Sequence, residues 1–412
     1  MNQAARGERI HIGVFGRRNA GKSSLLNALT GQKAALVSDV AGTTTDPVYQ
    51  PMELHGAGAV VFIDTAGFDD TGTLGGMRVE RTRSAAARAD IALILFDEED
   101  AGDAAGASEA FLWAEKLRRA GTTVVPVVAK TDIRPEKGAL LANAVGVRLG
   151  VPAVCVSAET GDGVAELRDA LVREIQRGGV QRRLLAGLAE AGDTVLLVMP
   201  QDAEAPKGRL IQPQVQTIRE LLDIDCVAVG CTPGTMETAL ASLKKPPALI
   251  ITDSQVFAEV RAKTPPESKL TSFSVLFAAY KGDIDYFRAS AEKLDGLPND
   301  ARILIAEACT HNALDADIGR VKIPAMLRKK LGNGVRIDVV GGSDFPAEFS
   351  GYDLIVHCGA CMFNRRFVLS RVEAARAAGV PMTNYGILIA KLSGILDKVA
   401  FPNYMQSSAF VV

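Results

Sequence analysis

Cysteine and histidine residues are concentrated in two short segments of this 412-residue chain. Residues 309–311 read Cys-Thr-His, and residues 357–361 read His-Cys-Gly-Ala-Cys. Thiolate sulfur is a soft ligand that suits an iron–sulfur cluster or a zinc ion. A single cysteine is often just a small buried hydrophobic residue, but C-x-H together with H-C-x-x-C favours a metal centre. The candidate ligands are Cys309, Cys358 and Cys361, with His311 and His357 beside them.

Each of these segments follows a short apolar run that is typical of a buried strand, at residues 302–308 and 354–356. In open α/β sheets, ligands bind at the carboxyl ends of the strands, so we expect both segments at one edge of a sheet. Three thiolates leave one iron of a [4Fe-4S] cluster without a cysteine. His311 or His357 either fills that position or forms hydrogen bonds around the metal. A structural zinc ion held by three Cys and one His is the alternative.

A second group of residues predicts phosphate binding. Residues 16–23 have the P-loop pattern G-x-x-x-x-G-K-S, between an apolar strand at residues 10–15 and a helical pattern at residues 24–29. The glycines let successive N–H groups face phosphate oxygens, Lys22 adds a cation for the β- and γ-phosphates, and Ser23 offers a hydroxyl to Mg²⁺. The predicted phosphate-binding residues are Asn19, Ala20, Gly21, Lys22, Ser23 and Ser24.

A further motif indicates hydrolysis of a nucleoside triphosphate. A strand at residues 60–63 runs into Asp-Thr-Ala-Gly at residues 64–67. Asp64 can hold Mg²⁺, through water, and the Gly67 N–H can sense the γ-phosphate. Phe68 follows directly, where Ras-like proteins carry the glutamine that positions water. Because a phenylalanine cannot orient water, we expect catalysis to depend on other groups.

The next motif selects guanine. Residues 129–132 read Ala-Lys-Thr-Asp after an apolar strand. Guanine presents two neighbouring donors, N1–H and N2–H₂, and the Asp132 carboxylate can accept from both, while the stem of Lys130 can cover the ring. Ala129 stands where G proteins usually carry asparagine, which affects nucleotide affinity more than base choice. A later loop at residues 157–158 resembles the one whose backbone N–H meets guanine O6. The predicted guanine-binding residues are Lys130, Asp132, Ser157 and Ala158.

Composition limits the other possibilities. The net charge of −2 gives no electrostatic footprint for nucleic acid or an anionic membrane. Residues 1–9 are polar and lack the apolar core of a signal peptide, and no apolar run approaches the ~20 residues that span a bilayer. Six Cys in so long a chain are no disulfide framework, and thiolate ligands need a reducing compartment. We expect a cytoplasmic protein that binds neither membrane nor nucleic acid.

Strand and helix patterns alternate along the chain and predict an α/β fold in three parts. An N-terminal P-loop GTPase domain occupies residues 1–178, and a linker with a small α/β domain occupies residues 179–266. Residues 267–412 read as a doubly wound α/β domain with a parallel sheet that binds the metal. The middle domain is too small to bury much core alone and exposes sheet edges. We therefore expect it to pair with a second copy in a homodimer.

These motifs together resemble the [FeFe]-hydrogenase maturation GTPases of the HydF type. In that family a GTPase domain precedes C-x-H and then H-C-x-x-C, and the resemblance covers essentially the whole chain. It implies a [4Fe-4S] scaffold or carrier whose guest is the di-iron precursor of the hydrogenase H-cluster. Radical-SAM maturation enzymes would supply this guest, and apo-[FeFe]-hydrogenase would receive it. The resemblance also implies that the middle domain is a dimerisation domain.

The N-terminal motifs resemble those of the Era/TrmE-like GTPases. Gly-Thr-Thr-Thr-Asp at residues 42–46 resembles their first switch, in which the position of Thr44 closes on Mg²⁺ when GTP is bound. Asn19 resembles the asparagine that binds K⁺ in TrmE-like proteins, or is a plain turn residue. Such an ion could supply positive charge, so slow hydrolysis that is faster in K⁺ is expected. A tRNA-modifying GTPase of the TrmE type is the alternative function, although that family inserts its GTPase domain into a helical domain. The predicted catalytic residues are Lys22, Thr44, Asp64 and Gly67.

Overall fold

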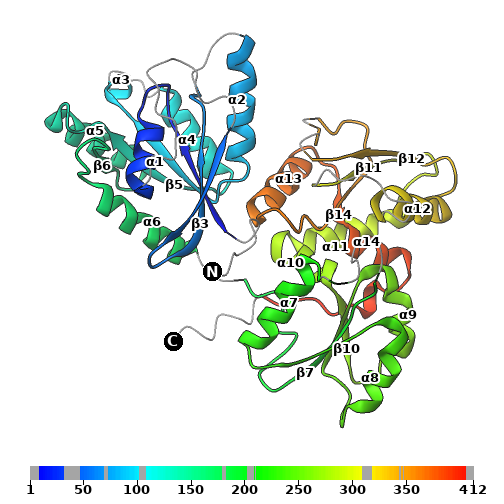
Figure 1. Ribbon diagram of the computed structural model, residues 1–412. Helices are drawn as coiled ribbons and strands as arrows, with labels where there is room; N and C mark the ends of the chain where they lie inside the picture. The colour runs from blue at the N-terminus through cyan, green and yellow to red at the C-terminus, as the bar shows by residue number, and fades with distance from the viewer. Residues whose placement is uncertain are drawn as a thin grey trace. The chain divides into compact units, whose positions relative to one another are not determined.

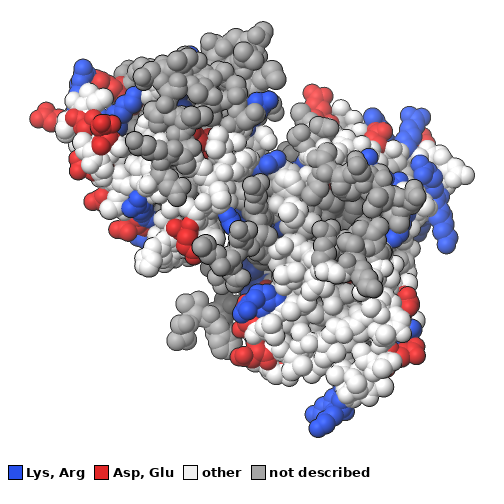
Figure 2. Space-filling view, in the orientation of Figure 1, with Lys and Arg blue, Asp and Glu red and all other residues white. Residues whose placement is uncertain are grey.

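The computed structural model describes residues 9–31, 47–68, 73–101, 108–178, 182–201, 208, 210–308, 318–342, 345–346 and 348–404. The chain forms two compact units, Met1–Val180 and Gln181–Val412. Both units are built from parallel or mostly parallel sheets flanked by helices (Figure 1), which confirms the predicted α/β class. None of the described helices combines the length and apolarity needed to cross a bilayer. Figure 2 shows acidic and basic side chains interspersed over the described residues of one face.

The first unit contains a six-stranded sheet in the order β2-β3-β1-β4-β5-β6. Only β2 runs antiparallel to its neighbour; the other strands are parallel. The strands are β1 Ile10–Phe15, β2 Val48–Leu54, β3 Gly58–Asp64, β4 Ile91–Phe96, β5 Thr123–Ala129 and β6 Val154–Val156. The helices are α1 Lys22–Thr30, α2 Thr73–Ala86, α3 Glu98–Ala101, α4 Glu109–Arg119, α5 Pro135–Leu149 and α6 Val164–Gly178.

This sheet is covered on both faces. One core cluster includes Leu26 of α1 and Leu171 of α6, and another includes Phe111 of α4 and Val145 of α5. The central strand β4 has the sequence IALILF, and all of its residues are buried. A continuous apolar strand is what a parallel sheet between two helical layers requires. The carboxyl ends of β1, β3, β5 and β6 therefore lead into the loops that carry the nucleotide motifs.

The second unit contains two four-stranded parallel sheets with the same topology. Their orders are β10-β9-β7-β8 and β12-β11-β13-β14. The strands are β7 Thr194–Val198, β8 Val227–Cys231, β9 Leu249–Thr252, β10 Lys269–Ser272, β11 Arg302–Ala306, β12 Arg336–Val340, β13 Leu354–His357 and β14 Met382–Asn384. The α-helices are α7 Gln212–Asp223, α8 Met236–Ser242, α9 Phe257–Lys263, α10 Phe273–Lys281, α11 Ile284–Glu292, α12 Ile323–Leu331, α13 Arg365–Ala377 and α14 Tyr385–Leu392.

In both sheets the third strand lies beside the first, on the side away from the second. Chain direction across the sheet reverses at that place, and such a switch point leaves a crevice at the carboxyl ends of the strands. In the second sheet the switch point lies between β11 and β13, which pair in parallel with Ala306 opposite His357. The two segments rich in Cys and His follow these two strands. The topology therefore brings the ends of the two predicted strands together.

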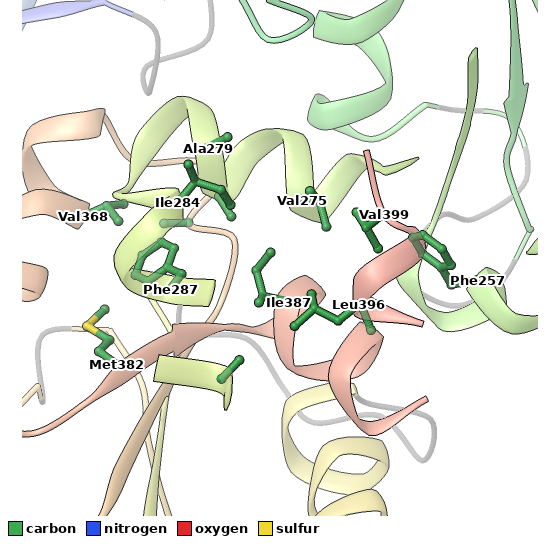
Figure 3. Close-up of a cluster of buried hydrophobic side chains, with 14 of the residues drawn as sticks. Phe257, Val275, Ala279, Ile284, Phe287, Val368, Met382, Ile387, Leu396 and Val399 are labelled. Carbon is green, nitrogen blue, oxygen red and sulfur yellow. The ribbon is translucent and has the colours of Figure 1, made fainter. Parts of the chain in front are cut away.

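The two sheets of this unit share a hydrophobic core. Phe257 of α9 and Val275 of α10 belong to the same buried cluster as Phe287 of α11 and Ile387 of α14 (Figure 3). The end of the described chain also returns to the first sheet. The Ala400 N–H donates to Leu270 O over 2.8 Å, and the Asn403 N–H donates to Ala186 O over 2.8 Å. The described residues between 184 and 403 therefore form one packed body.

Candidate functional site

The P-loop lies between β1 and α1 in the first unit. Asn19 and Gly21 have positive φ values of 60° and 94°, so the backbone curls before the helix begins. Lys22 is buried, and its Nζ donates to Gly16 O over 3.0 Å and to Arg17 O over 2.6 Å. The lysine thus arches over its own loop.

Ser23 and Asp64 come together at the start of α1. Ser23 Oγ donates to Asp64 Oδ2 over 2.7 Å. Burial raises the pKa of Asp64, while the hydrogen bond from Ser23 and the nearby Lys22 charge oppose that rise. Asp64 Oδ1 is also buried, with no hydrogen-bond partner among the described residues. A buried carboxylate beside a hydroxyl at a P-loop fits Mg²⁺ and its water shell.

The segment after Asp64 forms a hydrogen bond to the sheet and then packs in an aromatic stack. Thr65 Oγ1 donates to Val14 O over 2.6 Å. Phe68 is buried and stacks on Trp113 of α4, with ring centroids 5.8 Å apart. On the other side, Trp113 stacks on Phe15 at 6.1 Å. Phe68 therefore packs in the interior. Thr44 and the rest of residues 42–46 lie outside the described residues.

The loop after β5 lies against the P-loop. Lys130 has a φ of 57°, and a Cβ added to Gly21 would lie 3.9 Å from Lys130 Cε. The Thr131 N–H donates to Val156 O over 3.4 Å, which joins this loop to the end of β6. Ser157 is fully buried and accepts from the Thr160 N–H over 3.1 Å. Ala158 is partly exposed and Asp132 is exposed, so both can meet a base.

The second candidate site is the cysteine segment after β13. The Ala308 N–H donates to Cys358 Sγ over 3.1 Å, and the Ala360 N–H lies 3.4 Å from the same sulfur. Burial raises the pKa of the Cys358 thiol, and these two N–H groups oppose the rise. Cys361 is partly exposed three residues later. Cys309 and His311 lie outside the described residues; Ala308 is the last described residue before them.

Both ring nitrogens of His357 have neighbours within hydrogen-bonding distance. Nδ1 lies 2.7 Å from Cys358 O, and Nε2 lies 3.0 Å from Arg371 NH1. Since a carbonyl oxygen accepts and a guanidinium donates, Nδ1 carries the proton and Nε2 accepts. Complete burial lowers the pKa of His357 to about 3. Arg371 is itself buried, lies 4.4 Å from the Phe345 ring centroid and donates to Gly342 O over 2.7 Å.

Three cations lie near the cysteine loop. Lys281, at the end of α10, is buried and donates to backbone carbonyls of the cysteine loop. Arg365 donates to Tyr280 O over 3.2 Å and to Gly282 O over 2.8 Å, and burial lowers its pKa to about 10. Arg371 is the third. The sequence signal for each is a basic residue on an otherwise apolar helix face, which alone does not identify its distant partner.

The donor set at this site suits a soft metal. Cys358 accepts backbone N–H groups and Cys361 is accessible, and thiolates hydrogen-bonded in this way are the usual ligands of an iron–sulfur cluster. Within the part of the chain that the structure describes, no three His, Cys, Asp or Glu side chains gather closely enough to hold a metal. A metal held by these two cysteines would need a third ligand from outside that part, where Cys309 and His311 lie.

Three family models match the chain. The model described as the hydrogen maturase F dimerization domain matches residues 184–282, and that described as the hydrogen maturase F tetramerization domain matches residues 285–402. The model described as the 50S ribosome-binding GTPase matches residues 11–130. Together they match part of the first unit and most of the second.

Relatives among curated proteins are also GTPases. The GTPase Der of Wolinella succinogenes is 50% identical over 91 residues, which are 21% of this chain and 19% of the relative. The tRNA modification GTPase MnmE of Endomicrobium trichonymphae is 34% identical over 194 residues, 46% of this chain and 38% of the relative. The Der protein of Bartonella quintana is 31% identical over 65% of this chain. The chain spans about half or less of the length of each relative.

Solved GTPase structures are also similar. Era in complex with MgGDPNP and 16S ribosomal RNA is 20% identical, with a TM-score of 0.36, over 54% of this chain and 91% of that one. The cytosolic domain of the T. maritima FeoB iron transporter is 23% identical, with a TM-score of 0.32, over 41% of this chain and 64% of that one.

Proposed function

This chain belongs to the HydF-type hydrogenase-maturation GTPases, and on that premise we propose that it is a [4Fe-4S] scaffold that delivers a di-iron H-cluster precursor. The observation that carries the proposal is the hydrogen bond from the Ala308 N–H to Cys358 Sγ. It supports a site in which residue 309 and the C-x-x-C loop meet at the switch point between β11 and β13. TrmE-like tRNA modification has support only from the GTPase region, because residues 184–402 match other models.

We assign the resident cluster to the thiolates of Cys309, Cys358 and Cys361. When bound, such a cluster would supply an iron that lacks a cysteine ligand, which suits the exchange of a guest. The contacts of His357 with Cys358 O and Arg371 favour a supporting role for this histidine, since both ring nitrogens are already engaged. His311 is then the histidine that can complete the ligand set. The alternative of a structural zinc ion uses the same residues.

The guest is a cargo of the protein. Radical-SAM maturation enzymes would load the di-iron precursor, and apo-[FeFe]-hydrogenase would receive it. Matches to dimerization and tetramerization models support assembly of several copies. In the first unit, Lys22, Ser23 and Asp64 would hold the phosphates and Mg²⁺ of GTP, and the positions of Thr44 and Asn19 suit a switch and a K⁺ ion. Hydrolysis should be faster in K⁺ than in Na⁺ at equal ionic strength.

The test replaces each candidate ligand and measures metal and turnover side by side. Cys309→Ala, Cys358→Ala and Cys361→Ala should each lose the cluster, because two thiolates are too few to retain it against a chelator. His357→Ala should weaken loading by ~10–100-fold without abolishing it. GTP hydrolysis by the other unit should persist in every variant.

Iron and zinc content, electron paramagnetic resonance of the reduced protein and activation of apo-hydrogenase are the measurements. Zinc in place of iron in anaerobically reconstituted protein would favour the structural zinc site. A cysteine variant that still holds a full cluster and activates hydrogenase would contradict the three-thiolate assignment.

A further inference from the structure

A lysine from the neighbouring helix holds the backbone of the cysteine loop. Lys281 is the last residue of α10, and its side chain is 1% exposed. Its Nζ donates to three carbonyl oxygens, those of Ala360 at 3.0 Å, Cys361 at 2.9 Å and Phe363 at 2.6 Å. An ammonium group has three N–H donors, so its donor count matches this set of acceptors.

The loop has a conformation that needs such a support. Ala360, between the two cysteines, has a φ of 46°, which is a strained value for a residue with a Cβ. Carbonyl oxygens that point at one buried place repel one another, and a cation at their focus removes this repulsion. In the same turn, the Ala360 N–H lies 3.4 Å from Cys358 Sγ. The conformation that Lys281 stabilises is therefore also the one that presents a backbone donor to a ligand sulfur.

The end of α10 is itself held in place. Arg365, at the start of α13, donates to Tyr280 O and Gly282 O on either side of Lys281. The Lys281 ammonium also lies 5.2 Å from the centroid of the Phe277 ring, one turn earlier on the same helix. Lys281 thus reaches into the loop while Arg365 reaches back from the segment after it. These reciprocal contacts fix the loop against α10.

The lysine and the loop belong to different matched regions. Lys281 lies in residues 184–282, which match the dimerization model, and the loop lies in residues 285–402, which match the tetramerization model. We propose that Lys281 is a positioning residue of the metal centre, which sets the Cys358–Cys361 loop and places a positive charge beside the bound cluster. This inference rests on the proposed function, because it assumes a cluster at these cysteines.

Two consequences follow from this role. Without the ammonium, the loop has to be ordered by the metal alone, so the cluster should be lost to a chelator ~10–100-fold faster. A positive charge in a buried place stabilises the more negative, reduced state of a cluster. Its removal should therefore shift the midpoint potential to a more negative value. A side chain that only packs the fold would leave that potential unchanged.

The experiment uses the full-length chain and compares the variants Lys281→Met and Lys281→Gln with the unaltered protein. Methionine keeps the length of the side chain without donors, and glutamine keeps two donors without charge. Lys391→Met is the matched control, because Lys391 of α14 pairs with Glu292 and Asp295 in the same unit, away from the loop. We expect fast iron loss in Lys281→Met, partial recovery in Lys281→Gln, and a negative potential shift in both. Lys391→Met should behave as the unaltered protein does.

Readouts on the metal-free protein separate this inference from the proposed function. Hydrogen exchange at residues 360–363 and the rate of Cys361 alkylation should both rise in Lys281→Met and stay unchanged in Lys391→Met. If the unaltered chain binds no iron–sulfur cluster, the proposed function fails while these two rates still report the loop. If Lys281→Met shows unchanged iron retention, potential and loop exchange, or only a lower melting temperature, the positioning role is wrong. Should Lys281→Met fail to fold, Lys281→Gln carries the same comparisons.

Discussion

Individual side chains in the first unit have separate roles. Ser23 and Asp64 touch at 2.7 Å although they are 41 positions apart, and both were assigned to Mg²⁺ from their motifs alone. Phe68 fills the space against Trp113, so it contributes packing at a place where another GTPase would position water. His11, a residue without a predicted role, is buried at the start of β1. The roles of Asp132 and His11 can each be tested by a single substitution.

Asp132 is expected to set the choice of base. In Asp132→Asn the side chain offers one acceptor and one donor to the two donors of guanine, so GTP should bind more weakly. XTP has a carbonyl at C2 that accepts, so XTP should gain relative to GTP. Competition between the two nucleotides measures this preference directly. An unchanged preference for GTP in the variant would exclude the loop at residues 129–132 as the base-binding loop.

His11 is expected to make the first unit less stable in mild acid. Burial lowers its pKa to about 4; the hydrogen bond to the Arg9 carbonyl opposes this shift, and the charges of Arg88 and Arg9 add to it. The unfolded chain binds a proton below about 6.5, whereas the folded chain does not until about pH 4. The free energy of unfolding should therefore fall by about 1 kcal/mol per pH unit as the pH drops from 6.5 towards 4.

The measurement is denaturant unfolding followed by the fluorescence of Trp113, the single tryptophan of the chain, which lies in this unit. His11→Gln should flatten the pH dependence in that range. The exposed His55 gives the control, because His55→Gln should leave the pH dependence of the free energy of unfolding unchanged. Equal slopes in His11→Gln and the unaltered protein would show that His11 is not the titrating group.

Elements with strong patterns were predictable, and long-range contacts were not. The predicted helical pattern at residues 24–29 lies within α1, Lys22–Thr30, and the predicted strand at residues 354–356 lies within β13, Leu354–His357. Local spacing of apolar residues is enough to identify such elements. The partners of Lys281 lie 79 to 82 positions further along the chain. No local pattern links a lysine to carbonyls at that separation, because every residue has a carbonyl.

Helices α10 and α14 approach closely because one of them carries a glycine at the contact. A Cβ added to Gly386 of α14 would lie 2.6 Å from Ser274 Cβ and 3.1 Å from Val275 N. Gly386→Ala should therefore force the helices apart and lower the free energy of unfolding of the second unit by about 1–3 kcal/mol. Circular dichroism during denaturation measures this change. Gly296→Ala is the control, since a Cβ there would have no neighbour within 4 Å, and an equal loss in both variants would refute the steric reason.

At the scale of the whole molecule, the core clusters separate into two groups. Two clusters draw their residues from the first unit only, and three draw theirs from the second unit only. A ligand stabilises the body that binds it, by about 2.7 kcal/mol at a hundred times its dissociation constant. GTP should therefore stabilise only the first unit, and the proposed cluster should stabilise only the second.

Thermal unfolding should show this independence. GTP with Mg²⁺ should raise the midpoint temperature of the transition that Trp113 fluorescence reports. It should leave the midpoint temperature of the second unit unchanged. Reconstitution with iron and sulfide should raise the transition of the second unit, seen by calorimetry, without moving the Trp113 transition. Asp132→Asn should abolish the GTP effect alone. A single transition that both ligands raise equally would show that the units unfold as one.

The end of the described chain returns to the first sheet of the second unit, and this has a consequence for synthesis on the ribosome. The first unit has all of its strands and helices once Gly178 has emerged. The second unit must wait for Asn403, whose N–H closes on Ala186 O. At ~5–20 residues per second, the interval between these events is on the order of ten seconds or more. A newborn chain can therefore bind nucleotide well before the second unit is complete. Until α14 has emerged, the apolar residues of α10 and α11 that pack against it lack their partners.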